Sequence, residues 1–137
     1  MKLKDFLLNN TQLPTVRSSL NAYSLRQRSI ADNIANVETP EFKKTKVNFE
    51  ELFMEALKEK NSPLVKTDEK HLPEKLKALN VDAKVEEVKD DNYSNGINSV
   101  NLEEEMANLA INQIKFEAMS KLAKKQFSLL KSAISGR

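Results

Sequence analysis

Residues 13–37 read LPTVRSSLNAYSLRQRSIADNIANV, and the spacing of their apolar side chains predicts one long helix. These side chains recur at alternating intervals of three and four, which is the heptad spacing of a helix that packs along one seam. Pro14 suits the first turn of a helix, and Thr39-Pro40 ends it because a residue before proline avoids helical geometry. We expect Asn36 to close the helix in the left-handed conformation. The seam consists of Leu13, Val16, Leu20, Tyr23, Gln27, Ile30, Ile34 and Val37.

A second heptad pattern predicts a longer helix near the C-terminus, from Leu102 to Ile134. Asn101 is the expected N-cap, with Glu104 three residues later as in a capping box, and Gly136 is placed to close the helix. A lone heptad helix is marginal in water, so we expect the two terminal helices to form an antiparallel, coiled-coil-like pair. The second seam consists of Leu102, Met106, Leu109, Gln113, Phe116, Ser120, Ala123, Phe127, Leu130 and Ile134.

The chain between the two helices is polar and predicts little regular structure. Asn48 and Glu51 can cap a short helix over residues 49–60, and the alternation of Val81, Ala83 and Val85 predicts one short strand. The expected class is therefore mainly α, with an irregular or weakly β middle. We divide the chain into an N-terminal helical assembly segment with residues 1–40, a polar middle with residues 41–97 and a C-terminal heptad helix with residues 98–137, together forming one domain.

The composition excludes many kinds of catalytic site. The 137 residues include two glycines, one histidine and no cysteine, so no Gly-rich phosphate loop, thiolate nucleophile or disulfide can be written. His71 has no second histidine with which to share a metal ion. Lys43, Lys44 and Lys46 form a basic cluster, but a net charge of +2 and few aromatic side chains disfavour nucleic-acid binding. We expect no catalytic residue, no metal and no cofactor.

Residues 28–43, RSIADNIANVETPEFK, closely resemble the N-terminal signature of the flagellar rod and hook proteins, the axial family. That signature reads roughly I-A-x-N-I-A-N-x-x-T-P-G-[YF], and Glu41 stands at its usual glycine. Thr67 with His71, and the segment 98–106, resemble further elements of a proximal rod member of this family, so the resemblance covers nearly the whole chain. The signature residues are Asn33, Ile34, Ala35, Asn36, Thr39, Pro40 and Phe42.

This resemblance implies a structural axial subunit without enzymatic activity. Such a subunit leaves the cytosol through the flagellar type III apparatus without a signal peptide, and it polymerises in the periplasm into the proximal rod of the drive shaft that transmits motor torque. The implied partners are other copies of the chain, other rod proteins, the base (MS) ring with its adaptor and the export gate, with no nucleic acid and no small-molecule substrate.

The same resemblance gives several residues an expected role. We expect both seams to form assembly interfaces, in which Gln27 and Gln113 either face polar groups at a defined level of the assembly or point to solvent. The amides of Asn33 and Asn36 are expected to tie the following loop to the helix or to a neighbour. A short apolar cluster near the N-terminus is assigned to export or to docking at the gate. It consists of Leu3, Phe6, Leu7 and Leu8.

Two alternatives from other classes remain open at the level of the sequence. A cytosolic helical adaptor or export chaperone would fold as a stable dimer and would not co-purify with basal bodies. A cell-wall lytic enzyme would digest peptidoglycan, and the abundant carboxylates do not exclude one by number. Fractionation combined with a deletion and motility test separates these two alternatives from a rod subunit.

Overall fold

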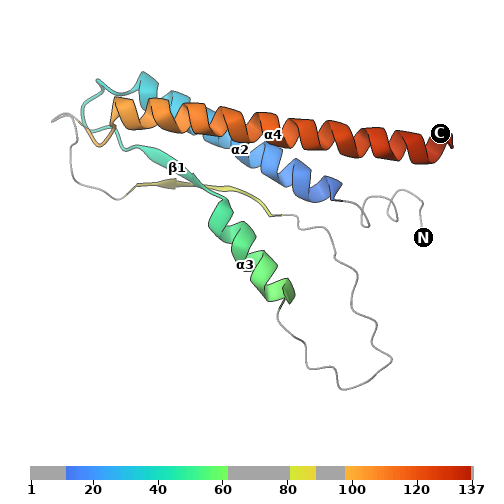
Figure 1. Ribbon diagram of the computed structural model, residues 1–137. Coiled ribbons are helices and arrows are strands. Elements are labelled where there is room, and N and C mark those ends of the chain that lie inside the picture. The colour runs from blue at the N-terminus through green and yellow to red at the C-terminus, as the bar shows by residue number, and fades with distance from the viewer. Residues whose placement is uncertain (1–11, 62–80, 89–97, 137) are drawn as a thin grey trace, which may run out of the picture.

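The computed structural model describes residues 12–61, 81–88 and 98–136, with side chains described for all of these except 57–61. Two long helices lie side by side, and a small sheet and a short helix branch from them (Figure 1). The prediction of a mainly α chain with two long terminal helices is confirmed. The division into three segments stays a prediction. The elements are α2 (Leu13–Ala35), β1 (Thr45–Asn48), α3 (Glu50–Asn61), β2 (Lys84–Glu87) and α4 (Leu102–Ser135).

The two long helices run antiparallel, as the sequence predicts. The end of α2 contacts the start of α4 through Asn33 and Glu105, and about two to three turns further back along α2 Gln27 and Tyr23 contact Asn112. At 1.5 Å per residue the 23 residues of α2 span about 35 Å and the 34 residues of α4 about 51 Å. The C-terminal part of α4 therefore projects beyond the start of α2 (Figure 1).

Most of the predicted helix boundaries are confirmed. Pro14 lies in the first turn of α2, and the side chain of Asn101 caps α4 by accepting hydrogen bonds from the backbone N–H groups of Glu103 and Glu104. Gly136 ends α4 in the left-handed conformation, with φ at 66°. The short helix α3 begins one residue later than expected.

The prediction of a left-handed Asn36 is wrong, since its φ is −105°. Its backbone N–H instead bonds the carbonyl groups of Asp32 and Asn33, so the helix ends without a reversal of φ. The left-handed residue is Glu41, with φ at 59°. Glutamate therefore keeps the conformation for which glycine is the usual residue in the signature.

The two short strands form an antiparallel pair in which Thr45 lies opposite Glu87 and Val47 lies opposite Val85. We predicted no strand at β1, and β2 begins three residues after the predicted alternation. Val47 is 2% exposed, whereas all four residues of β2 are exposed. One buried side chain among four residues is too short a pattern to reveal a strand by its periodicity.

The core of the described chain is small and partly polar. Its only aromatic cluster among the described residues joins α2 to α3, with Tyr23 edge-on to Phe49 at 6.2 Å and Phe49 stacked on Phe53 at 5.6 Å between centroids. None of the helices in the described chain is both long and apolar enough to cross a membrane. The buried apolar residues are Leu13, Val16, Ala22, Ile30, Val47, Phe49 and Val100.

The contact between α2 and α4 follows the predicted seams only in part. In α2 the small side chains of Ser19 and Ala22 are buried beside the seam, while Gln27 on the seam is exposed. In α4 the buried residues are Glu105 and Asn112, each next to a predicted seam position. Polar groups thus make the hydrogen bonds that join α2 to α4, and many apolar side chains of α4 are left exposed by the described part of the chain.

Candidate assembly surface and its supporting junction

Asn33 joins three elements at the end of α2. Its side-chain amide donates to the carbonyl oxygen of Thr45 at 2.9 Å and to the carboxylate of Glu105 at 3.1 Å. Its side-chain oxygen accepts from the backbone N–H of Thr45 at 2.9 Å. The hydroxyl of Ser29 adds a bond to the Thr45 carbonyl at 3.0 Å. Side chains of α2 therefore occupy the edge of β1 that a third strand would otherwise pair with.

Asn36 stabilises the loop that follows α2. Its side-chain amide donates to the carbonyl of Asp32 at 2.8 Å, and its side-chain oxygen accepts from the hydroxyl of Thr39 at 3.2 Å. Asn36 thus ties the loop to its own helix, whereas Asn33 ties the helix to β1 and α4. Among the other signature residues, Ile34 and Phe42 are half-buried, and Ala35, Thr39 and Pro40 are exposed.

Asn98 holds the same loop from the C-terminal half of the chain. It is fully buried, and its amide donates to the carbonyl groups of Asn36, Val37 and Thr39 at 2.8–3.0 Å. Its side-chain oxygen accepts from the N–H of Val100 at 2.9 Å. We did not predict this role. The available signal was an asparagine two residues before a valine, which suits a side-chain turn onto the backbone.

A cluster of charges joins α2, α3 and α4. The guanidinium of Arg26 binds both carboxylate oxygens of Glu50 and donates to the Val47 carbonyl at 3.0 Å. Lys115 reaches the same carboxylate at 3.1 Å. The hydrogen bond from Arg26 lowers the pKa of Glu50 to about 2, with Lys115 assisting and partial burial opposing. The same carboxylate raises the pKa of Arg26, whose guanidinium also lies over the ring of Tyr23 at 5.8 Å.

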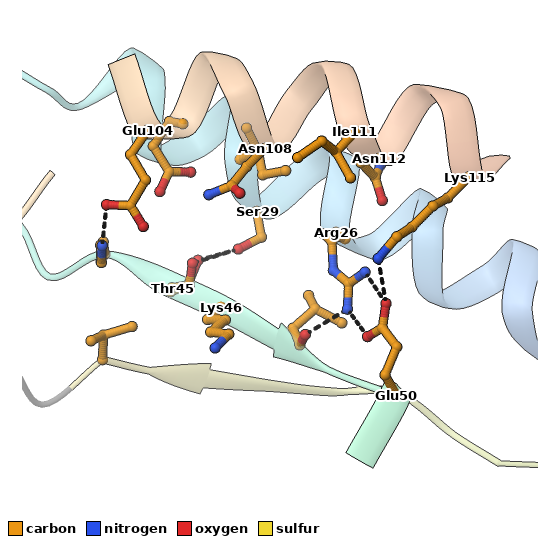
Figure 2. Close-up of a pocket in the computed structure, with 15 residues that line it drawn as sticks. Arg26, Ser29, Thr45, Lys46, Glu50, Glu104, Asn108, Ile111, Asn112 and Lys115 are labelled. Carbon is orange, nitrogen blue, oxygen red and sulfur yellow. Dashed lines mark hydrogen bonds and ion pairs between the residues drawn. The ribbon is translucent and has the colours of Figure 1, made fainter. Parts of the chain in front are cut away.

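A groove of about 470 Å³ lies between β1 and α4 (Figure 2). At one end lies the cluster formed by Arg26, Glu50 and Lys115, and at the other end Lys44 pairs with Glu104 at 3.5 Å. In the described ranges, which omit residues 62–80 and 89–97, no three His, Cys, Asp or Glu side chains gather as metal ligands would. Hydrogen-bonding and charged groups surround a few apolar side chains in this groove.

The exposed apolar residues of the described chain lie mainly on α4. We call them together the α4 apolar surface; its members are 40–76% exposed and lie on more than one side of the helix. Exposed apolar side chains at this density on one helix mark an interaction surface. The members are Leu102, Met106, Ile111, Ile114, Phe116, Phe127, Leu129 and Ile134.

The predicted assembly residues are distributed between this surface and the interior. Leu102, Met106, Phe116, Phe127 and Ile134 belong to the α4 apolar surface. Of the remaining seam residues, the buried ones are Leu13, Val16 and Ile30, and the half-buried ones are Leu20, Tyr23, Ile34, Val37, Leu109, Ser120, Ala123 and Leu130.

The two glutamines in the seams are exposed. Gln27 accepts a hydrogen bond from the Asn112 amide at 2.9 Å, so it meets a polar group within its own chain. Gln113 donates to Glu117 on its own helix at 3.5 Å. The predicted export cluster, Leu3, Phe6, Leu7 and Leu8, lies outside the described residues, as does His71.

Comparison with known proteins identifies the family. No family model matches the chain. The curated flagellar basal body rod protein FlgB of Borreliella burgdorferi is 36% identical over 106 residues, which cover 74% of this chain and 78% of the relative. The chain belongs to the FlgB family of flagellar basal body rod proteins. The FlgB of Borrelia hermsii is 37% identical, covering 79% of this chain and 84% of the relative, and that of Bacillus subtilis is 29% identical, covering 90% and 93%.

Membership in the FlgB family confirms the resemblance that residues 28–43 indicate. We call the contacts of Asn33, Asn36 and Asn98 the junction. Through it, the linear signature of the family takes part in a tertiary contact. Asn33 reaches Glu105, and the loop after Asn36 is held by Asn98. The two halves that carry the family resemblance are therefore in direct contact with each other.

Proposed function

We propose that this chain is a structural subunit of the proximal flagellar rod, exported by the flagellar type III apparatus and assembled in the periplasm. The observation that carries the proposal is the α4 apolar surface. The described residues of one chain leave this surface exposed, and subunits packed around a common axis would bury it. Family membership supports a place in the basal body rod.

The proposed partners are other copies of the chain, other rod proteins, the base ring with its adaptor, and the export gate. Long, uninterrupted helices suit a shaft that transmits torque. The proposed role of the chain is structural rather than enzymatic. Leu3, Phe6, Leu7 and Leu8 are proposed to serve export or docking, and deletion of residues 2–9 should abolish secretion or rod assembly.

The test replaces Phe127 and Ile134 by glutamate in a strain that lacks the native gene. Both side chains are more than half exposed and contribute little to the fold of one chain. We expect normal cellular levels, loss of the chain from purified basal bodies and loss of swimming. The matched control replaces exposed Ser128 and Ser132 on the same helix by glutamate, which should leave motility unchanged.

The outcome also separates the alternative functions. If purified basal bodies contain as much of the Phe127→Glu, Ile134→Glu variant as of the wild-type chain, the proposal is contradicted. A chain that stays in the cytosol as a soluble dimer would favour an adaptor or chaperone, and release of peptidoglycan fragments by the purified chain would favour a lytic enzyme.

A further inference from the structure

Glu50, the first residue of α3, is the shared counterion of two cations that come from two different helices. Arg26 of α2 donates through Nη1 to the Oε1 atom of Glu50 at 2.7 Å, and Lys115 of α4 donates to the same oxygen at 3.1 Å. Figure 2 shows both side chains directed at this carboxylate. Because they share one acceptor atom, the two cationic nitrogen atoms lie within about 6 Å of each other.

In the described ranges, the ion pairs of Arg26 and Lys115 are those with Glu50. The other carboxylates of the groove are engaged toward its far end, where Glu104 pairs with a lysine of its own and Glu105 accepts a hydrogen bond from the end of α2. Without the Glu50 carboxylate, two like charges would face each other across the helix pair. Their repulsion is stronger than in bulk water because the side chain of Arg26 is only 17% exposed.

The position of Glu50 depends on a small aromatic anchor. Phe49 connects β1 to α3, is 3% exposed, and lies edge-on to Tyr23 of α2. Phe53, one turn into α3, stacks on Phe49. Met54 is already 53% exposed, and α3 extends away from the two long helices (Figure 1). The aromatic contacts that hold the described part of α3 are therefore at its first turn.

We propose that the first turn of α3 controls the opening of the α2–α4 pair. When it is docked, the Glu50 carboxylate neutralises one cation from each long helix. When it is undocked, Arg26 and Lys115 repel each other near the level at which Tyr23 contacts Asn112, and the pair loosens there. The proposal concerns contacts within one chain, so it stands apart from the rod function.

This arrangement couples the position of α3 to the state of the helix pair. A partner that holds α3 away from α2 and α4 would favour the open pair, and a partner that holds α3 against them would favour the closed pair. Each shifts the equilibrium by no more than the difference in its affinity for the two states.

Amide hydrogen exchange of the full-length chain, followed by mass spectrometry, measures the opening of the pair. Glu50→Gln keeps the shape of the side chain and removes its charge. We expect residues 20–27 of α2 to exchange about threefold faster in this variant, with a smaller change at residues 30–35. Lys115→Gln alone should leave the exchange close to that of the wild type, because Arg26 keeps its carboxylate partner. Unchanged exchange of residues 20–27 in Glu50→Gln would overturn the proposal.

The double variant distinguishes repulsion from the loss of a bond. If the cations repel each other, adding Lys115→Gln to Glu50→Gln should slow the exchange of residues 20–27 back toward the wild-type rate. A double variant that exchanges as fast as Glu50→Gln, or faster, would contradict this. The control adds Lys121→Gln, which removes an exposed cation of the same helix and should give no recovery. Equal recovery with Lys121→Gln would trace the effect to net charge and would also overturn the proposal.

A change in the aromatic anchor tests whether the docking of α3 controls the pair. Phe53→Ala removes the stacking on Phe49, leaves every charge in place and affects a side chain that is only half-buried. We expect faster exchange both in α3 and in residues 20–27, and adding Lys115→Gln should slow the exchange of residues 20–27 alone. The control Met54→Ala, at an exposed position of the same helix, should leave the exchange of residues 20–27 unchanged. Faster exchange confined to α3 in Phe53→Ala would show that α3 moves without affecting the pair, and the proposal would be wrong.

Discussion

Asn33 and Glu105 lie 72 positions apart in the chain and are joined by a buried hydrogen bond of 3.1 Å. The bond connects the end of α2 to the start of α4, and the same asparagine binds both backbone groups of Thr45 in β1. Because Asn33 is 1% exposed, its side-chain amide has no access to water and is satisfied by these bonds instead. This junction sets the point at which the helix pair begins.

Asn33→Ala should therefore destabilise the chain strongly. The substitution leaves the buried Glu105 carboxylate and the backbone N–H of Thr45 without their bonds, while the Thr45 carbonyl keeps its bond from Ser29. An unsatisfied buried group costs about 1–3 kcal/mol. We expect the free energy of unfolding to fall by about 2–3 kcal/mol in urea titrations followed by circular dichroism.

The matched control is Asn36→Ala in the same signature. Asn36 is half-buried, and its side chain bonds only Asp32 and Thr39 in its own helix and loop, so the loss should stay below about 1 kcal/mol. Equal losses in the two variants would show that burial at Asn33 is not the determining factor.

Asn98→Asp should destabilise the loop after α2 while leaving the pair of α2 and α4 largely intact. The aspartate has nearly the same shape, but it cannot donate to the carbonyl groups of Asn36, Val37 and Thr39, and its charge would face three carbonyl oxygens. We expect faster amide hydrogen exchange in residues 36–42, with a smaller change in the middle of α2. Unchanged exchange in that loop would contradict the role of Asn98.

The pH dependence of stability should report the contact between Arg26 and Glu50. The pKa of Glu50 is lowered from 4.5 to about 2, so its stabilising contribution is fully present above pH 4.5 and is lost as the pH falls toward 2. Glu50 is 44% exposed, so solvent screening keeps this contribution to about 1 kcal/mol or less. Urea midpoints of the wild type and Glu50→Gln should differ at pH 6 and converge near pH 2.

Glu55→Gln is the control for that titration. Glu55 lies on the same helix and is exposed, so its substitution should shift the urea midpoint little at either pH. A difference between wild type and Glu50→Gln that stays constant from pH 6 to pH 2 would contradict the assigned pKa.

The helices could be predicted from the sequence because their signals are local. Pro14, Asn101 and Gly136 each act on the backbone within a turn, and the heptad spacing extends over many residues. The face that packs was harder to predict. Apolar spacing favoured the seam through Gln27, but Ala22 and Ser19 beside that seam are more deeply buried than Gln27, which is exposed.

The junction could not be predicted because its partners are distant in sequence and mostly polar. Nothing near Asn33 indicates Glu105, and Asn98 lies about 60 positions from the carbonyl groups it binds. The family signature pointed to Asn33 and Asn36 without showing what their amides bind. Strand β1 was missed for a related reason, since side chains of α2 stabilise one of its edges in place of a neighbouring strand.

Glu41 offers a last test, because it holds the left-handed conformation with φ at 59°. A side chain in this region costs about 1 kcal/mol relative to glycine, while glycine loses a similar amount of backbone entropy on folding. Glu41→Gly should therefore leave the melting temperature equal to that of the wild type or slightly higher. Glu41→Val should lower the free energy of unfolding by about 1–2 kcal/mol, because a β-branched side chain tolerates positive φ least. Both changes remove the same carboxylate, so a similar loss in the two variants would trace the effect to charge and not to backbone conformation.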